Sequence, residues 1–250
     1  MKVLALLALL LAAPGTALAQ PSLVAELAET QVEITTGFTG ASILVFGATA
    51  LPISAQPGSP GDEVLIVAAG PVQPMVVRRK VRVLGFWLNG PSATFPDVPG
   101  YYAIAGTRPP WEMLAEPDRQ ERRLGLDTLP LRARGGQASP AFRAALLDLK
   151  QQEGLWAEQT APIQVSGGQL FNARLPLPAT VATGDYTVQV LLIRQARVMA
   201  RQELIFRVQR VGTAAQINAL AVQKPALYGL ACIAIAAFAG WLGSVIFRRG

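Results

Sequence analysis

The sequence predicts a mainly β protein: an immunoglobulin-like antiparallel sandwich, in one or two lobes, with a helical insertion and one C-terminal transmembrane helix. Three observations support this prediction. Short alternating or apolar runs recur between turns rich in glycine and proline, which is typical of antiparallel sandwiches. A proline-rich stretch with helical character interrupts these runs near the middle of the chain. The chain ends in an uncharged apolar run followed by two arginines.

Residues 1–19 are predicted to be a cleaved signal peptide. Lys2 precedes an apolar run, and the small residues Ala17 and Ala19 form a cleavage site before Gln20. The alternative is an uncleaved N-terminal anchor, but the apolar run of eleven residues is short for a membrane span. We therefore expect the mature chain to begin near Gln20 and to be exported as far as Lys224.

Residues 20–106 are predicted to form an N-terminal β region. The longest expected strand bends at Gly85, and Asn89-Gly90-Pro91 is expected to turn the chain after it. The expected strands lie at residues 23–36, 41–47, 63–69, 75–88, 92–95 and 101–105.

Residues 107–159 are predicted to be a connector that packs over the sandwich. Prolines interrupt its first part, where short helical turns are expected at 111–115 and 118–124. Ser139 as N-cap and Pro140 at the first helical position then predict an amphipathic helix over 140–156. One apolar stripe is expected to face the sheet, formed by Phe142, Leu146, Leu149 and Trp156.

Residues 160–211 are predicted to form a C-terminal β region. Its last two strands are expected to be joined by a tight turn at 195–197. Gly184-Asp185-Tyr186 is similar to the tyrosine-corner region of immunoglobulin-type sandwiches. The two β regions are expected to meet in one sandwich, with a second lobe as the alternative. The expected strands are 163–165, 169–175, 185–194 and 198–211.

After a juxtamembrane segment, 212–225, residues 226–247 are predicted to span the membrane. At about 1.5 Å per residue this run reaches roughly 33 Å, enough to cross a hydrocarbon core about 30 Å thick. The arginines of the tail, 248–250, indicate its cytoplasmic side. We therefore expect a single-pass protein of the inner membrane with its N-terminal domain in the periplasm.

Small residues recur at every fourth position of the predicted span, which gives a face on which another helix could pack closely. The partner would be another membrane protein or a second copy of the chain, and chance composition is the alternative. The face consists of Cys232, Ala236, Gly240 and Ser244.

Composition excludes several classes of site. The chain has no histidine, and its one cysteine lies in the predicted span, so the exported part has no disulfide, no histidine or thiolate metal site and no histidine-dependent triad. We expect no cofactor. Without Lys2, Arg248 and Arg249, 19 basic residues face 16 acidic ones. This mild, scattered excess argues against nucleic acid and favours anionic lipid as the partner of the charge near the membrane.

The densest basic cluster lies at residues 76–83. On a strand, Arg78, Lys80 and Arg82 share one face. Two interpretations stay open: a solvated face opposite a core face, or a face that binds an anionic ligand or partner.

Three segments carry a resemblance to a known family: ITTGFTGASILVFGA at 34–48, the stretch from VVRRKVRVLGFWLNG to AGTRP at 76–109, and GDYTVQVLLIR at 184–194. With the lone C-terminal span, the chain resembles the alphaproteobacterial transmembrane protein family. The resemblance implies a topology but no catalytic residues, because the family is defined by sequence rather than by an activity. It also raises the expectation of a permease of the sulfite-exporter type encoded nearby.

Three functions are consistent with the sequence, and we expect that the protein is not an enzyme. The first is a membrane-anchored periplasmic interaction module, an accessory subunit of a transporter. The second is an anchored binding protein for a small anion that uses Arg78, Lys80 and Arg82. The third is a hydrolase built on carboxylates such as Asp97, Asp118 and Asp185, whose spacing indicates no shared cleft.

Overall fold

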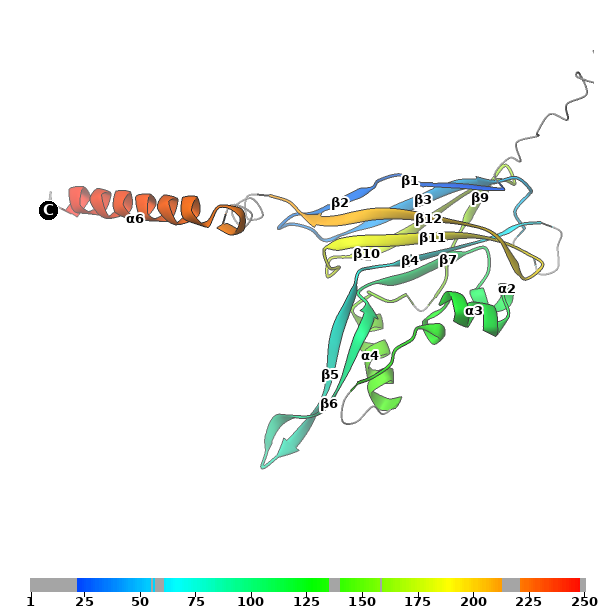
Figure 1. Ribbon diagram of the computed structural model, residues 1–250, viewed down its shortest axis with the longest axis horizontal. Coiled ribbons are helices and arrows are strands. Elements are labelled where there is room, and N and C mark those ends of the chain that lie inside the picture. The colour runs from blue at the N-terminus through cyan, green and yellow to red at the C-terminus, as the bar shows by residue number, and fades with distance from the viewer. Residues whose placement is uncertain are drawn as a thin grey trace, which may run out of the picture.

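The described part of the protein is a two-sheet sandwich with an arm, a helical connector and a separate C-terminal helix (Figure 1). The computed structural model describes residues 22–54, 56, 61–134, 140–157, 159–212 and 221–247. The predicted signal peptide and cytoplasmic tail lie outside these residues. The first sheet has the order β1 (Leu23–Leu27), β3 (Gly40–Thr49), β10 (Leu170–Pro178), β9 (Gln164–Ser166). The second has the order β2 (Gln31–Ile34), β12 (Arg197–Arg210), β11 (Gly184–Arg194), β4 (Glu63–Ala69), β7 (Tyr102–Gly106), β8 (Ala161–Pro162).

This strand order is that of an immunoglobulin-like domain. Such domains place strands A, B, E and D in one sheet and G, F and C in the other. Here the strands that correspond to A, B, E and D are β1, β3, β10 and β9, and those that correspond to G, F and C are β12, β11 and β4. After β1 the chain crosses to the second sheet, where β2 pairs with β12 in parallel. The predicted fold class, mainly β with a helical insertion and a C-terminal apolar helix, is confirmed.

The two predicted β regions share both sheets and so form one sandwich rather than two lobes. From the N-terminal region, β3 pairs with β10 and β4 pairs with β11, both antiparallel. Gln202 of β12 joins the two sheets where β12 lies beside the edge strand β1. Its side-chain amide accepts a hydrogen bond from the Ala25 amide at 2.8 Å and donates one to the Ala25 carbonyl at 2.7 Å.

The predicted tyrosine corner is present, in the core at the end of the sandwich where β4 leads into the arm. The Tyr186 hydroxyl donates to the carbonyl oxygen of Ala182, four residues upstream, at 2.7 Å. The Tyr186 ring stacks on Phe206 with 4.9 Å between ring centroids. Because both rings are fully buried, this contact fixes the register of β11 against β12 at that end of the sandwich.

The connector covers the outer face of the second sheet. It contains α2 (Pro110–Met113), α3 (Glu116–Arg122), a 3-10 turn η1 (Leu126–Thr128) and α4 (Pro140–Gln152). Six of the seven residues of β4 are buried because the strand is covered on both faces. This explains its continuous apolar sequence, which an antiparallel strand with one wet face would not have.

The predicted helix 140–156 ends four residues early, and its predicted stripe is partly wrong. After Gln152, Gly154 takes a left-handed conformation with φ of 69° and reverses the chain. Trp156 is therefore buried beyond the helix rather than on it, and Leu149 is exposed. The buried stripe is Phe142, Leu146 and Lys150.

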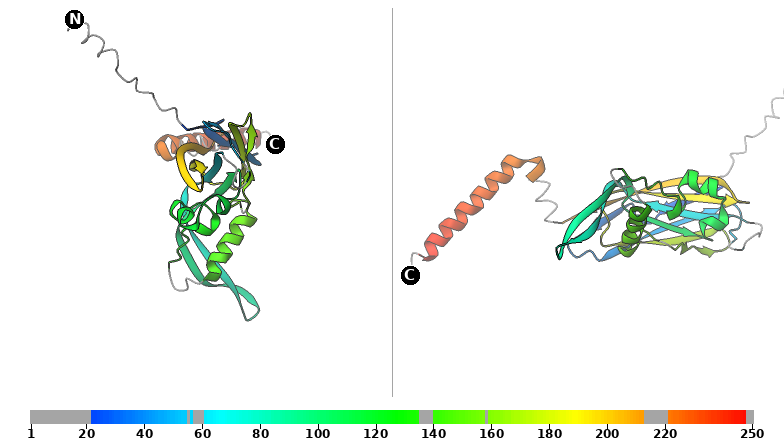
Figure 2. Two further views of the ribbon diagram at one scale, coloured as in Figure 1. Left: turned by 90° about the vertical axis from the view of Figure 1, so that its right-hand side faces the viewer. Right: turned by 90° about the horizontal axis from the view of Figure 1, so that it is seen from below.

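Residues 72–99 form a long hairpin that we call the arm: β5 (Val72–Val83) and β6 (Phe86–Pro99). The prediction of one strand at 75–88 bent at Gly85 is wrong. Leu84 and Gly85 form a two-residue turn, with φ of 48° and 87°. The predicted turn at 89–91 lies inside β6, where the pairing register shifts. Gly90 fits there because a Cβ would lie 2.8 Å from the Val81 side chain. The outer part of the arm projects away from the sandwich in Figure 1 and in the left view of Figure 2.

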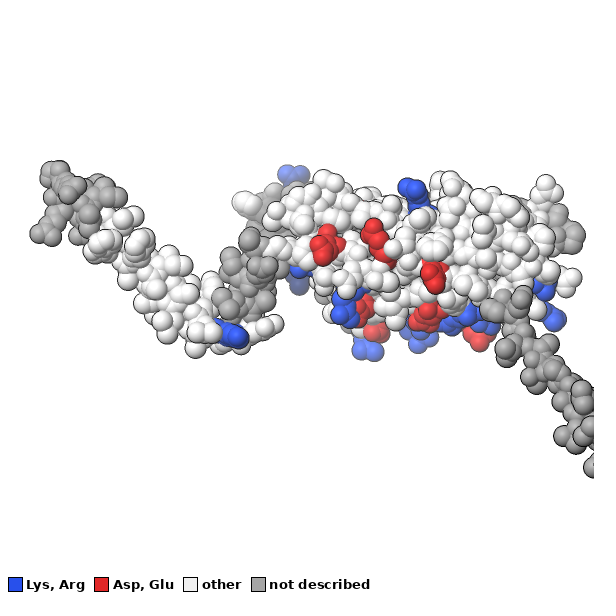
Figure 3. Space-filling view, turned by 90° about the horizontal axis from the view of Figure 1, so that it is seen from above, with Lys and Arg blue, Asp and Glu red and all other residues white. Residues whose placement is uncertain are grey.

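The C-terminal helix α6 (Pro225–Phe247) begins one residue before the predicted span and ends with it. Among the described residues it is the one helix long and apolar enough to cross a membrane. Figure 3 shows no coloured atoms along its described length beyond the end nearest the sandwich, whereas acidic and basic side chains are mixed on the sandwich.

Candidate functional site: a basic arm and an arginine-lined cleft

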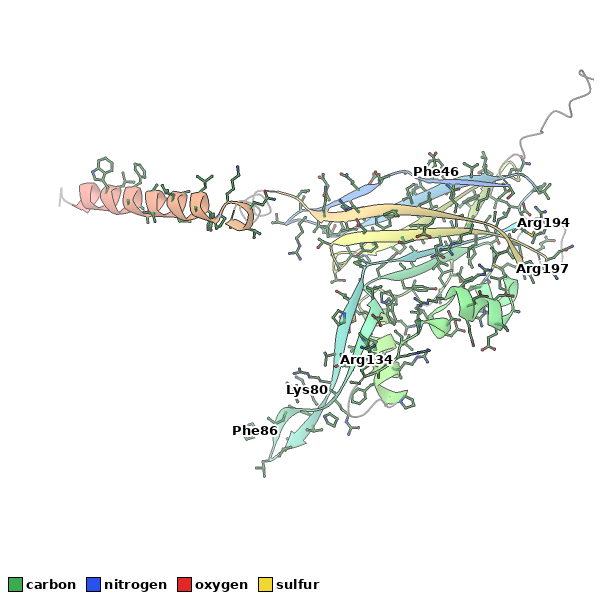
Figure 4. The ribbon with its side chains drawn as sticks, viewed as in Figure 1. Phe46, Lys80, Phe86, Arg134, Arg194 and Arg197 are labelled. Carbon is green, nitrogen blue, oxygen red and sulfur yellow. The ribbon has the colours of Figure 1, made fainter. Side chains whose placement is uncertain are left out.

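The far end of the arm carries an exposed apolar cluster, residues 83–88, which we call the arm tip. Figure 4 shows Phe86 at this end, with Lys80 between it and the sandwich. Leu84 is 94% exposed, Phe86 73% and Trp87 66%. Val83 and Leu88 are exposed as well. Such a cluster on an element that projects from the domain is typical of an interaction site.

The basic side chains predicted as a binding face lie directly behind the arm tip. Arg78 pairs with Ser92, Lys80 with Asn89 and Arg82 with Trp87 in the hairpin register. Arg79 is exposed too, because the outer part of the arm is uncovered on both faces, so four exposed basic side chains lie within five residues of β5. We call Arg78, Arg79, Lys80 and Arg82 the basic band.

A cleft of about 680 Å³ lies at the base of the arm. The outer face of the second sheet forms its floor through Val67, Tyr102 and Gln189, and the connector forms a wall. The arm base contributes residues including Asp97. Arg78, Lys80 and Arg82 do not line this cleft.

Four arginines line the cleft, so we call it the arginine-lined cleft. Arg122 and Arg123 come from the end of α3, and Arg132 and Arg134 come from the extended chain after η1. All four are exposed, and none forms an ion pair within the described residues. Asp97 is the one carboxylate among the lining residues. The cleft is therefore suited to an anionic group.

Tyr102 holds one wall of the cleft in place. Its hydroxyl donates to the Arg123 carbonyl and accepts a hydrogen bond from the Gly125 amide, both at 2.9 Å. Burial raises the pKa of Tyr102 to about 12, so the hydroxyl keeps its proton at neutral pH. Arg123, with φ of 58°, ends α3 in a left-handed conformation. Together these features fix the end of α3 and therefore the positions of Arg122 and Arg123 beside the cleft.

The sequence analysis missed these four arginines. Their signal was present as a high arginine density in a proline-rich connector, at residues 119–134. No helix or strand periodicity links the two pairs, because they reach the cleft from opposite sides of η1.

The three carboxylates of the hydrolase hypothesis do not meet at the cleft. Asp97 lines it, whereas Asp118 on α3 and Asp185 on β11 do not. Arg207 binds Asp185 at 2.6 Å, and this hydrogen bond holds the pKa of Asp185 below its ordinary value. Within the described residues no group of three or more acidic or thiol side chains is placed to hold a metal ion.

The predicted packing face lies along α6. Cys232, Ala236 and Gly240 are on the exposed helix surface, while the side chain of Ser244 lies outside the described part of the structure. Whether another helix packs there stays a prediction.

The fold and α6 define a class: a membrane protein that joins an immunoglobulin-like domain to one candidate C-terminal span. Residues 22–249 match the family described as Putative transmembrane protein (Alph_Pro_TM), and the chain belongs to this family. The resemblance found in the sequence is thereby confirmed. No curated protein matches the sequence.

Proposed function

We propose that the protein is a membrane-anchored interaction module, an accessory subunit of a transporter. In this proposal α6 spans the inner membrane with its C-terminus in the cytoplasm, and the sandwich stands in the periplasm after removal of the signal peptide. Protease added to spheroplasts should then degrade the sandwich. Protection of the sandwich until the membrane is opened would contradict this orientation.

The observation that carries the proposal is the arm. An isolated two-stranded hairpin is only marginally stable in water, and hairpins normally gain stability by packing against other elements. The base of the arm is packed in this way: Val77, Ala93 and Phe95 are buried. The outer half exposes its apolar and basic side chains alike. This is a surface for something outside the chain.

Affinity purification from native membranes in mild detergent tests the proposal. The intact protein is compared with a version that ends after Lys224 and therefore lacks α6. The first partner to look for is a permease of the sulfite-exporter type. A permease recovered with the intact form alone supports a contact through the span, and recovery with both forms supports a contact through the sandwich or arm. Recovery of no stoichiometric partner with either form would contradict the proposal.

A second function is favoured by the arginine-lined cleft: binding of a small anion. Titration calorimetry of the full chain with phosphate, sulfate and sulfite measures it. Arg122, Arg123, Arg132 and Arg134 changed together to Gln should abolish binding. The matched control, with Arg78, Lys80 and Arg82 changed to Gln, should bind as the unmodified chain does. The reverse result would assign the anion site to the arm, and no binding by the unmodified chain would contradict this function.

A further inference from the structure

We propose that the arm tip docks into the anionic surface of the bilayer that α6 spans. This inference rests on the proposed membrane anchoring and names the partner of the outer arm. Four observations carry it: the composition of the arm, the order of its apolar and basic parts, the end of the sandwich from which it leaves, and its length.

The arm is basic and apolar without any acidic side chain over residues 72–96. At the arm tip, Trp87 and Phe86 are the ring types that bind at the boundary between headgroups and hydrocarbon. The basic band adds four positive charges that attract anionic lipid. A bilayer surface offers hydrocarbon and, a few ångströms outward, phosphate, and the arm presents an apolar tip and then a basic band in the same order.

The arm and the anchor leave the same end of the sandwich. Because β4 and β12 both pair antiparallel with β11, they run in the same direction. Ala69, at the end of β4, pairs with Thr187, and Thr187 pairs with Ile205, five residues before β12 ends at Arg210. The chain enters the arm after β4 and leads to α6 after β12. The turn at the opposite end of the sandwich, next to Arg197, points away from the bilayer in this arrangement (Figure 4).

The tether is long enough to let the arm tip reach the bilayer. Twelve residues of β5 give an arm of about 40 Å at roughly 3.3 Å per residue. Residues 211–224 connect β12 to α6, and because 221–223 are helical this segment spans at most roughly 45 Å. The sandwich can therefore stand on the bilayer on two supports, the anchor and the arm.

A fluorescent probe on the full chain tests the inference. Cys232 is changed to Ser, Leu84 is changed to Cys and labelled with nitrobenzoxadiazole, and the chain is reconstituted in nanodiscs of phosphatidylcholine with phosphatidylglycerol. Docking predicts a blue-shifted emission that spin-labelled lipids quench. The same label at Arg197→Cys should stay in water. Phosphatidylcholine alone, or high salt, should weaken the quenching at Leu84 because both reduce the attraction between the basic band and the surface.

Charge variants provide the matched control. Each residue of the basic band changed to Gln should lower the ratio of docked to undocked arm about fivefold. A variant with all four cleft arginines, at 122, 123, 132 and 134, changed to Gln should leave that ratio unchanged.

The outcomes separate this inference from the proposal beneath it. A chain that stays with the disc while its Leu84 label remains in water would overturn docking and leave the anchoring intact. A chain that does not enter the disc would overturn the anchoring and the inference together. A photocrosslinker at Leu84 that captures a protein instead of lipid in native membranes would also overturn docking and assign the arm tip to a protein partner.

Discussion

Two arginine–aspartate pairs in the sandwich have similar geometry but different surroundings. Arg194 binds Asp62 at 2.7 Å, and Asp62 is fully buried with its second carboxylate oxygen unpaired among the described residues. Arg207 binds Asp185 at 2.6 Å, and both side chains are more than half exposed. Loss of a partner leaves a buried charge uncompensated, whereas an exposed charge is solvated by water.

We therefore expect Arg194→Gln to lower the urea midpoint much more than Arg207→Gln. The arginine partner holds the pKa of Asp185 low, so the stability that this pair gives is present above the ordinary carboxyl pKa and is lost as pH falls through the folded value. Chemical unfolding of both variants in detergent at neutral and acidic pH measures this. Equal losses from the two variants at neutral pH would contradict the expectation.

Tyr102 makes the stability of the domain depend on alkaline pH. Its pKa is raised from 10.0 to about 12, mainly by burial, so its contribution is complete below pH 10 and is lost as pH rises through 12. Between these values the loss is about 1.4 kcal/mol per pH unit. Tyr102→Phe should cost roughly 1–3 kcal/mol at neutral pH, because the Gly125 amide and the Arg123 carbonyl lose their partner.

Tyr102→Phe should also lack the part of the fall in unfolding free energy between pH 10 and 12 that Tyr102 causes. Unfolding by urea at several pH values between 9 and 12 measures both effects. A variant with the full slope of the unmodified chain would show that Tyr102 does not titrate in this range.

At the scale of single elements, two hairpins close through two-residue turns in which both residues have positive φ. These are Leu84-Gly85 in the arm and Gln195-Ala196 between β11 and β12. Leucine at such a position costs on the order of 1–2 kcal/mol, while asparagine is favoured there. Leu84→Asn should therefore strengthen the arm and slow hydrogen exchange of the amides beside the turn. It should also weaken membrane docking, because it removes the most exposed apolar side chain.

Ala196→Asn is the matched control for this change. It should slow exchange at the ends of β11 and β12 without altering the arm or its docking. Faster exchange in the arm of Leu84→Asn would show that the leucine is not strained.

Most strands could be predicted from the sequence because alternation and apolar runs are local signals. The run 63–69 matches β4, and the tight turn near 195 follows from the change between two alternating strands. The arm could not be predicted correctly, because Asn89-Gly90-Pro91 has the composition of a turn and Leu84-Gly85 does not. Asn89-Gly90-Pro91 instead lies inside β6, where Gly90 approaches Val81 and Arg79 of β5 closely. That approach depends on the pairing of β5 with β6, which the composition of residues 89–91 does not indicate.

The site was less predictable than the fold for the same reason. Arg78, Lys80 and Arg82 lie within five residues of one another, so the sequence alone shows that they cluster. The cleft arginines come together only because the connector folds across β4 and β7, which are separated in the chain by the whole arm. Contacts of that range depend on topology that periodicity does not encode.

At the scale of the whole molecule, the sandwich depends on pairing between distant halves of the chain. Within the described residues, four strand pairs join the halves: β2–β12, β3–β10, β4–β11 and the short pair β7–β8. We expect residues 22–106 and 160–212, expressed separately, to remain unfolded, and expect the complete domain to fold. Circular dichroism and limited proteolysis of both fragments measure this. A protease-resistant fragment would indicate two independent units.

The parallel pairing of β2 with β12 has a mechanical consequence. A pull on α6 along the direction of β12 acts across the hydrogen bonds that β12 makes with β2 on one side and β11 on the other. Bonds loaded in this way share the force and must break together, whereas bonds at the end of a peeled strand break one after another. The sandwich therefore resists such a pull best when it is held at its opposite end, next to Arg197, whereas a pull between α6 and the arm, which leave the same end, peels the strands apart.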